Sequence, residues 1–199
     1  MDAKKNNEVS TEIYFYQLLK EMLKTTQLTH ITVSELTKQA NVYRQTFYYH
    51  FKDIYDLVSK MFMYELSQIV GKYSDASFWS LIQAVISYAL ENKTVLLNTI
   101  YCIDLSIVRT YTLKGMYYLI DLATRASEKH FSVDLSEEIH HELVNMLSQY
   151  LSGEILDWFA SGMNTFDEKR AEIISHLVEF TLSSGLLSLA DYEKRRNKQ

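Results

Sequence analysis

The sequence predicts an all-α protein, and three observations lead to this fold class. The 199 residues include no proline and only five glycines, so residues that interrupt or reverse a chain are scarce. Apolar residues make up 47% of the chain, enough for a sizeable core. They also recur at intervals of three and four residues, the period of an amphipathic helix. We expect about nine helices, forming an N-terminal domain (residues 1–55), a connecting helix (54–72) and a larger C-terminal domain (73–199).

The N-terminal domain is predicted to hold three helices. The first runs from about Thr11 to Thr26, with Ser10 or Thr11 as its cap. Its buried side is expected at Ile13, Leu18, Leu19, Met22 and Leu23. The second begins at a capping box, Thr32-Val33-Ser34-Glu35, in which the Thr hydroxyl accepts the amide three residues on and the Glu reaches back. Asn41 then supplies a tight turn, because Asn tolerates positive φ better than other non-glycine residues.

The third predicted helix, from about Tyr43 to Phe51, has an apolar inner face and a polar outer face. Phe47 and Phe51 lie four residues apart and share the inner face. Arg44 and Gln45 are candidates for base contacts, because their forked groups match base edges in the major groove of DNA. The candidates for phosphate contacts are Thr32, Thr46, Tyr48, Tyr49, His50 and Lys52. The alternative is a helical hairpin with a solvated face.

The string Thr46-Phe47-Tyr48-Tyr49-His50-Phe51-Lys52, preceded by Ala40-Asn41-Val42, resembles the TetR family of bacterial transcription regulators. It is most similar to the subgroup that includes the dihydroxyacetone kinase regulators. The resemblance covers about a third of the chain, from Ser10 to Leu66. Asn41 replaces the usual turn glycine, and Ile54 stands where many relatives have a Lys that touches the phosphate backbone. The resemblance implies a helix-turn-helix repressor that a small-molecule effector releases from DNA.

The rest of the chain is predicted to be helical as well. Asp53 is expected to cap the helix from about Ile54 to Lys72, and residues 71–77 are the expected domain boundary. Gly115 is a candidate break in the longest segment, and the tail from Tyr192 is expected to fray. The further helices are expected at about 78–91, 94–103, 104–130, 136–162 and 165–190.

The last two predicted helices are apolar on more than one side, as central or interface helices are. The resemblance implies that they form a four-helix dimer interface, with the candidates Tyr150, Gly153, Trp158, Ile173, Leu177 and Phe180. A symmetric dimer can set two reading helices about 34 Å apart, which matches successive major grooves and implies a near-palindromic operator on double-stranded DNA. The alternative is a monomer with a large core.

The charge distribution argues against binding by bulk charge alone. Residues 1–55 hold seven Lys and Arg against six Asp and Glu, and residues 56–199 hold 13 against 19. Counterion release from so few cations gives modest affinity. We therefore expect that recognition depends on geometry, on local cations such as Arg44 and Lys52, and on two copies of the chain.

Other classes of function find little support in the sequence. No phosphate loop or nucleophile elbow is present, so no catalytic residue and no cofactor are expected. His140 and His141 point about 100° apart on a helix and cannot share a metal. The single cysteine, Cys102, excludes an internal disulfide. We find no run of about 20 apolar residues and no signal peptide, so we expect a cytoplasmic protein without a membrane span.

The middle of the chain leaves two interpretations open. It is rich in tyrosine, at positions 88, 101, 111, 117 and 118, with Asp104, Arg109 and Asp121 among them. Aromatic residues with a few polar groups suit a small-molecule pocket, but at helical spacing they also suit an ordinary core. A C-terminal domain that binds a partner protein, or a helical scaffold that has lost DNA binding, are the remaining alternatives.

Overall fold

The computed structural model describes residues 2–73, 77–164 and 167–196, and every regular element within them is helical, which confirms the predicted all-α fold. Because α9, η2 and α10 follow one another directly, the described residues hold nine separate helices besides a short 3₁₀ turn. The elements are α1 (Asp2–Leu23), η1 (Leu28–His30), α2 (Val33–Gln39), α3 (Arg44–His50), α4 (Ile54–Lys72), α5 (Phe78–Glu91), α6 (Lys93–Ile100), α7 (Leu105–Phe131), α8 (Glu137–Ala160), α9 (Glu168–Phe180), the π-helical turn η2 (Thr181–Gly185) and α10 (Leu186–Arg196).

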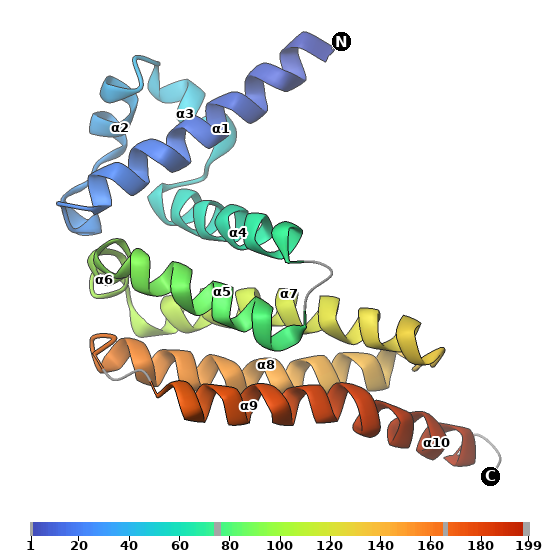
Figure 1. Ribbon diagram of the computed structural model, residues 1–199. Helices are drawn as coiled ribbons and strands as arrows, with labels where there is room; N and C mark the ends of the chain where they lie inside the picture. The colour runs from blue at the N-terminus through green and yellow to red at the C-terminus, as the bar shows by residue number, and fades with distance from the viewer. Residues whose placement is uncertain (1, 74–76, 165–166, 197–199) are drawn as a thin grey trace.

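The short helices α2 and α3 gather with α1 at one end of the molecule, and the long helices α7, α8 and α9 lie together at the other (Figure 1). Helix α4 lies between these two groups and contacts α1, α5 and α7. The strongest pairing of any two helices is that of α7 with α8. The reading helix predicted from the sequence, α3, is therefore joined to the long helices mainly through α4 and α1.

Two hydrophobic clusters form the core, and α4 contributes to both. The first cluster lies around α1, α2 and α3 and includes Phe15, Leu19 and Phe47, all fully buried. Leu57, Val58 and Met61 of α4 belong to it, and Val95 joins it from α6. The second cluster lies between α7, α8 and the last helix, and Leu66 and Val70 from the far half of α4 pack against it. A single helix thus ties the two cores together.

Several helix limits differ from the prediction. Helix α1 begins at Asp2, upstream of the start expected at about Thr11. Helix α7 runs unbroken through Gly115. Residues 74–76 of the expected boundary, the expected helix start at 165–166, and the final residues 197–199 lie outside the described residues.

The last helix also continues to Arg196, beyond the expected end near Ala190. Two contacts hold this extension against the start of α8. The guanidinium of Arg196 lies 3.2 Å from the Glu138 carboxylate, and Glu193 accepts the backbone amide of Ser136 at 3.2 Å. The predicted fraying of the tail is therefore wrong for residues 192–196, because α10 docks on α8.

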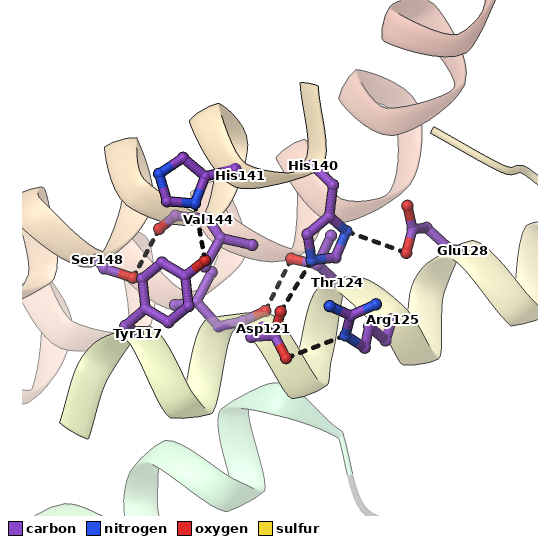
Figure 2. A network of polar contacts seen from close by, with 10 residues as sticks. Tyr117, Asp121, Thr124, Arg125, Glu128, His140, His141, Val144 and Ser148 are labelled. Carbon is purple, nitrogen blue, oxygen red and sulfur yellow. Dashed lines mark hydrogen bonds and ion pairs between the residues drawn. The ribbon is translucent and has the colours of Figure 1, made fainter. Parts of the chain in front are cut away.

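A polar network joins α7 to α8 (Figure 2). The imidazole of His140 is 4% exposed, and its two nitrogens lie 2.9 Å from Asp121 Oδ1 and 3.2 Å from Glu128 Oε2. Which of these nitrogens donates depends on the tautomer of the ring. Arg125 Nε donates to the other oxygen of Asp121 at 3.1 Å. Two basic side chains and two carboxylates therefore meet at this junction.

By length and composition alone, the helix from Glu168 to Arg196 could cross a membrane, a criterion that core helices of soluble proteins also meet. In its most apolar 18-residue window, 28% is buried within the chain. Several of its large apolar side chains are exposed, including Ile173 (61%), Leu177 (58%) and Phe180 (64%). This exposed face is too large to be explained by isolated surface residues.

Candidate nucleic-acid interface

The helix-turn-helix geometry predicted from Thr32 to Asn41 is present in α2 and the turn after it. Glu35 N donates to Thr32 Oγ1 at 3.2 Å, and Thr32 N donates to Glu35 Oε2 at 3.1 Å, so both halves of the capping box form. Asn41 adopts φ +53°, the left-handed conformation that we expected at this turn. The amide of Val42 then donates to Thr37 O at 3.0 Å, which directs the chain into α3.

The inner face of α3 is anchored by aromatic packing. Phe47 and Phe51 are 0% and 1% exposed, as predicted. Phe15 of α1 meets both rings edge to face, with centroids 5.6 Å and 5.8 Å away. Edge-to-face pairs add to the energy of burial and restrict the rotation of the helix about its axis. The side of α3 that faces outward is therefore set by these three rings.

The outer face of α3 carries most of the side chains that we predicted for DNA. Arg44, Gln45, Tyr48, Tyr49 and Lys52 are exposed, and Tyr48 and Tyr49 are 57% and 71% exposed. Thr32 is exposed at the start of α2, while Thr46 is half-buried. The arrangement places one forked cation, one amide and two phenols along two turns of a short helix. A helix of this size fits into the major groove of B-DNA.

Arg44 and His50 are held in different ways. The guanidinium of Arg44 donates to the hydroxyl of Ser34 in α2, which holds this exposed side chain at the N-terminal end of α3. The side chain of His50 is 7% exposed and its Nδ1 lies 3.4 Å from Glu12 of α1. His50 therefore points inward, because its ring pairs with α1, and the structure does not present it for the phosphate contact that we predicted.

A set of polar contacts fastens the end of α3 to the start of α4. Asp53 Oδ1 accepts Asp56 N at 2.8 Å, which confirms Asp53 as the cap of α4. Lys60 Nζ donates to His50 O at 2.7 Å and lies 3.3 Å from the Asp56 carboxylate. A cation at the last carbonyl groups of a helix is favourable. Ile54, at the position where relatives have a Lys, packs against the first cluster instead.

Three residues of this region were not predicted from the sequence. Tyr43, just before α3, is 86% exposed and extends the outer face. Its position next to Arg44 could have indicated this in the sequence. Ser34 holds Arg44, and Lys60 holds the C-terminal end of α3. Contacts that join different helices, such as these two, leave no periodic signal in the sequence.

The residues predicted for a dimer interface fall into two groups. Tyr150, Ile173 and Leu177 line a groove between α8 and α9, and Phe180 is exposed further along the same helix. Gly153 is exposed, with open space around the position of an added Cβ. Trp158 is half-buried and lines a cavity between the helices. Arg170 bridges the two helices by two hydrogen bonds to Glu154, at 2.7 and 3.0 Å, and these bonds lower the pKa of that carboxyl.

This cavity has a volume of about 490 Å³, lies between α4, α5, α6, α7, α8 and α9, and is partly open to the surface. Of the five tyrosines considered for a pocket, Tyr88 and Tyr111 line it, and the other three do not. The Tyr111 hydroxyl donates to Tyr55 O in the first turn of α4 at 3.4 Å. Burial, followed by the nearby Asp53 and Asp56 carboxylates, raises the pKa of Tyr111, so the phenol remains a donor.

The remaining polar residues do not assemble a site of other chemistry. Tyr117 contacts His141 at 3.0 Å, and His140 is engaged by two carboxylates as described above. Within residues 2–73, 77–164 and 167–196, no group of three His, Cys, Asp or Glu side chains is arranged to hold a metal ion. Cys102 is half-buried, and its sulfur lies 3.8 Å from the Thr29 hydroxyl.

The chain matches no protein-family model, and it matches none of the curated proteins. Among solved structures, its fold is similar to that of the dihydroxyacetone kinase operon activator DhaS, with a TM-score of 0.64 and 19% sequence identity. The similarity covers 87% of this chain and 97% of that chain. At this level of identity the likeness establishes a common fold.

Proposed function

We propose that this chain is a DNA-binding transcriptional regulator of the TetR type, which acts as a homodimer and is controlled by a small-molecule effector. The observation that carries the proposal is the outer face of α3. Arg44, Gln45 and Tyr48 are exposed there, while Phe47 and Phe51 fix the opposite face in the core. The fold shared with DhaS, which is named an operon activator, supports a role in transcription.

In the proposed complex α3 enters the major groove. Arg44 and Gln45 at its N-terminal end contact base edges, and Tyr48, Tyr49 and Lys52 contact phosphates together with Thr32 and Thr46. His50 acts instead as a positioning residue, because its pairing with Glu12 of α1 holds the reading helix. The bond from Arg44 to Ser34 supports this assignment, since a restrained side chain loses less conformational entropy on binding.

The proposed dimer uses the exposed apolar face of α8 and α9. Tyr150, Ile173, Leu177 and Phe180 are each at least 49% exposed in the single chain. A second copy would cover them, and Gly153 would allow a close approach of helices. Two copies would also supply the paired reading helices that a near-palindromic operator requires. We propose that a second copy of the chain, and not a membrane, covers this apolar face.

The proposed control runs from the cavity to the reading helix through α4. Val58, Phe62 and Leu66 of α4 line the cavity, and Tyr111 of α7 contacts the first turn of α4 as well as lining it. The following turn of α4 holds the end of α3 through Lys60. An effector that displaces α4 would therefore move α3 and change the separation of the two reading helices, which lowers operator affinity in the proposed repressor.

The test is selection of bound sequences from random duplex DNA, followed by titration of the selected duplex and a scrambled one at two salt concentrations. Arg44→Ala should weaken binding to the selected duplex by about 1–3 kcal/mol and relax the sequence preference. Lys52→Ala should weaken both duplexes alike and reduce the salt slope by about one.

The matched control is Lys129→Ala, which removes one exposed positive charge at the far end of α7. It should leave both affinities nearly unchanged. Equal losses on both duplexes for Arg44→Ala would contradict its role in reading bases. A reporter gene placed behind the selected duplex shows the sign of regulation. If the protein is a repressor, deletion of its gene should raise the reporter signal.

A further inference from the structure

The cavity between α4 and the C-terminal helices has a wall that is almost entirely hydrocarbon. Its side chains come from every helix around it and include Phe62, Leu66, Val85, Ile86, Met116 and Ile155. None of the residues of α5 is fully buried within the chain. Its Ile82, Val85, Ile86 and Ala89 line the cavity. A volume of about 490 Å³ lies in the range of small-molecule sites.

The hydroxyl groups on this wall are mostly engaged elsewhere. Thr99 and Thr112 donate to backbone carbonyls of their own helices, at 2.7 and 2.9 Å. Tyr111 donates to α4. The exception is Tyr88, whose buried oxygen makes no hydrogen bond of normal geometry within the described residues. Burial, and next the charge of the Glu65 carboxylate and its hydrogen bonding with the phenol, raise the pKa of Tyr88, so this phenol stays protonated. On the part of the wall formed by α4 to α7, a ligand would thus find the Tyr88 phenol, beside Glu65, and few other polar groups.

The charged residues of the lining are Glu154, Asp157, Asp167 and Arg170, all from α8, α9 and the cap of α9. Three carboxylates face one guanidinium, which already donates twice to Glu154. Asp167 accepts the backbone amide of Arg170 at 3.0 Å. An anionic ligand would therefore meet net negative charge and no unpaired cation among the lining residues that the structure describes. Burying such a charge without a partner is costly.

We propose that the cavity binds an uncharged, mainly hydrocarbon molecule with a single hydrogen-bonding group, of the class of medium-chain alcohols or ketones. Sugars, small polyols and carboxylates are excluded by the same wall. The inference rests on the proposed function only in naming this molecule the effector, and the binding itself does not depend on DNA recognition.

Isothermal titration calorimetry on the whole chain tests the proposal. The probes are ten-carbon chains with different head groups, a shorter alcohol and glycerol. We expect 1-decanol to bind at least tenfold more tightly than decanoate or decylammonium, and glycerol to show no binding. From octanol to decanol each added methylene should tighten binding about fourfold, which corresponds to about 0.8 kcal/mol. The heat-capacity change should be negative, as it is when apolar surface is buried. Tightest binding of decanoate or of decylammonium, or no binding of any alcohol, would overturn the proposal.

Two variants decide whether decanol binds in this cavity. Gly115 lines it from α7, and a Cβ added there meets Leu66 Cδ2 at 3.6 Å, so Gly115→Ala fits and serves as the matched control. Gly115→Phe should fill the cavity and weaken decanol at least tenfold, whereas Gly115→Ala should change its affinity less than threefold. Ala89→Phe fills the cavity from α5 and replaces Gly115→Phe if that variant does not fold. Unchanged decanol affinity in a folded, filled variant would refute this site.

DNA binding by the same preparations separates the two proposals. A protein that binds decanol but shows no preference among duplexes refutes the proposed function and leaves the cavity ligand intact. A protein that binds its selected duplex but no uncharged chain refutes the ligand class alone. If both hold, decanol should lower the affinity for the selected duplex in the wild type, and should do so much less in Gly115→Phe.

Discussion

Replacing His140 by alanine tests the polar junction between α7 and α8. The imidazole is buried, and it lies within hydrogen-bonding distance of Asp121 and Glu128 at once. The two carboxylates keep 25% and 15% of their side-chain surface exposed. Without the ring, Asp121 retains its bond from Arg125, but Glu128 loses its imidazole donor. The variant therefore leaves negative charge poorly compensated at a tightly packed helix pair.

The size of the effect follows from the degree of burial. Removing one member of a fully buried ion pair costs about 3–5 kcal/mol. Because both carboxylates here remain in partial contact with water, we expect a loss of about 2–3 kcal/mol in the free energy of unfolding for His140→Ala. His141→Ala is the matched control. That neighbouring imidazole is exposed and contacts Tyr117, so its loss should cost about 0.5 kcal/mol or less.

Urea denaturation at a fixed protein concentration measures both variants, and a pH series adds a second criterion. Burial alone would raise the pKa of Asp121, but hydrogen bonds from His140 and Arg125 lower it below its usual value. A lowered pKa in the folded state adds stability above the unfolded value of about 4, and this stability is lost as the pH falls through the folded value. The advantage of wild type over His140→Ala should thus shrink in acid. Equal losses for the two histidine variants, or an advantage that grows in acid, would refute the assigned interactions.

Four further substitutions test the fold and the assembly. Phe15→Ala should cost about 3–5 kcal/mol in urea denaturation, because it removes a fully buried ring that packs against Phe47 and Phe51; a loss below 1 kcal/mol would contradict this packing. Asn41→Ala should cost about 1 kcal/mol at the left-handed turn, and Asn41→Gly should not destabilise; similar losses for both would argue against that conformation. Gly115→Ala should raise the thermal midpoint and add about 0.5–1 kcal/mol, since α7 is regular there and the new Cβ has room. Leu177→Glu should convert a dimer to a monomer in sedimentation, while Leu122→Glu on α7 should not; an unchanged sedimentation coefficient for Leu177→Glu would count against the proposed interface.

Much of the end of the molecule that holds α2 and α3 could be predicted because its signals are local. The capping box at Thr32, the left-handed turn at Asn41 and the cap at Asp53 each depend on residues within a few positions of one another. The spacing of Phe47 and Phe51 likewise set which face of α3 is buried. The limits of α5 agreed with the prediction for the same reason, since Ser77 accepts the amide of Ser80 and starts the helix.

What could not be predicted depends on partners far away in the sequence. The inward turn of His50 needs Glu12 of α1, and the extension of α10 to Arg196 needs Glu138 of α8. Val85 and Ala89 lie four residues apart and share one side of α5, but this spacing does not tell whether that side meets another helix or a cavity. The family resemblance made Trp158 a candidate for the dimer interface, and the structure places it in the lining of the cavity.

The packing of α4 against two separate cores determines how the molecule responds to a perturbation. Its first half is embedded in one apolar core and its second half rests on the other. The middle of α4 cannot unfold locally without exposing one of the two cores to water. Displacements at one end should reach the other as a tilt of the whole helix, and thermal unfolding should proceed as one cooperative step with both ends melting together.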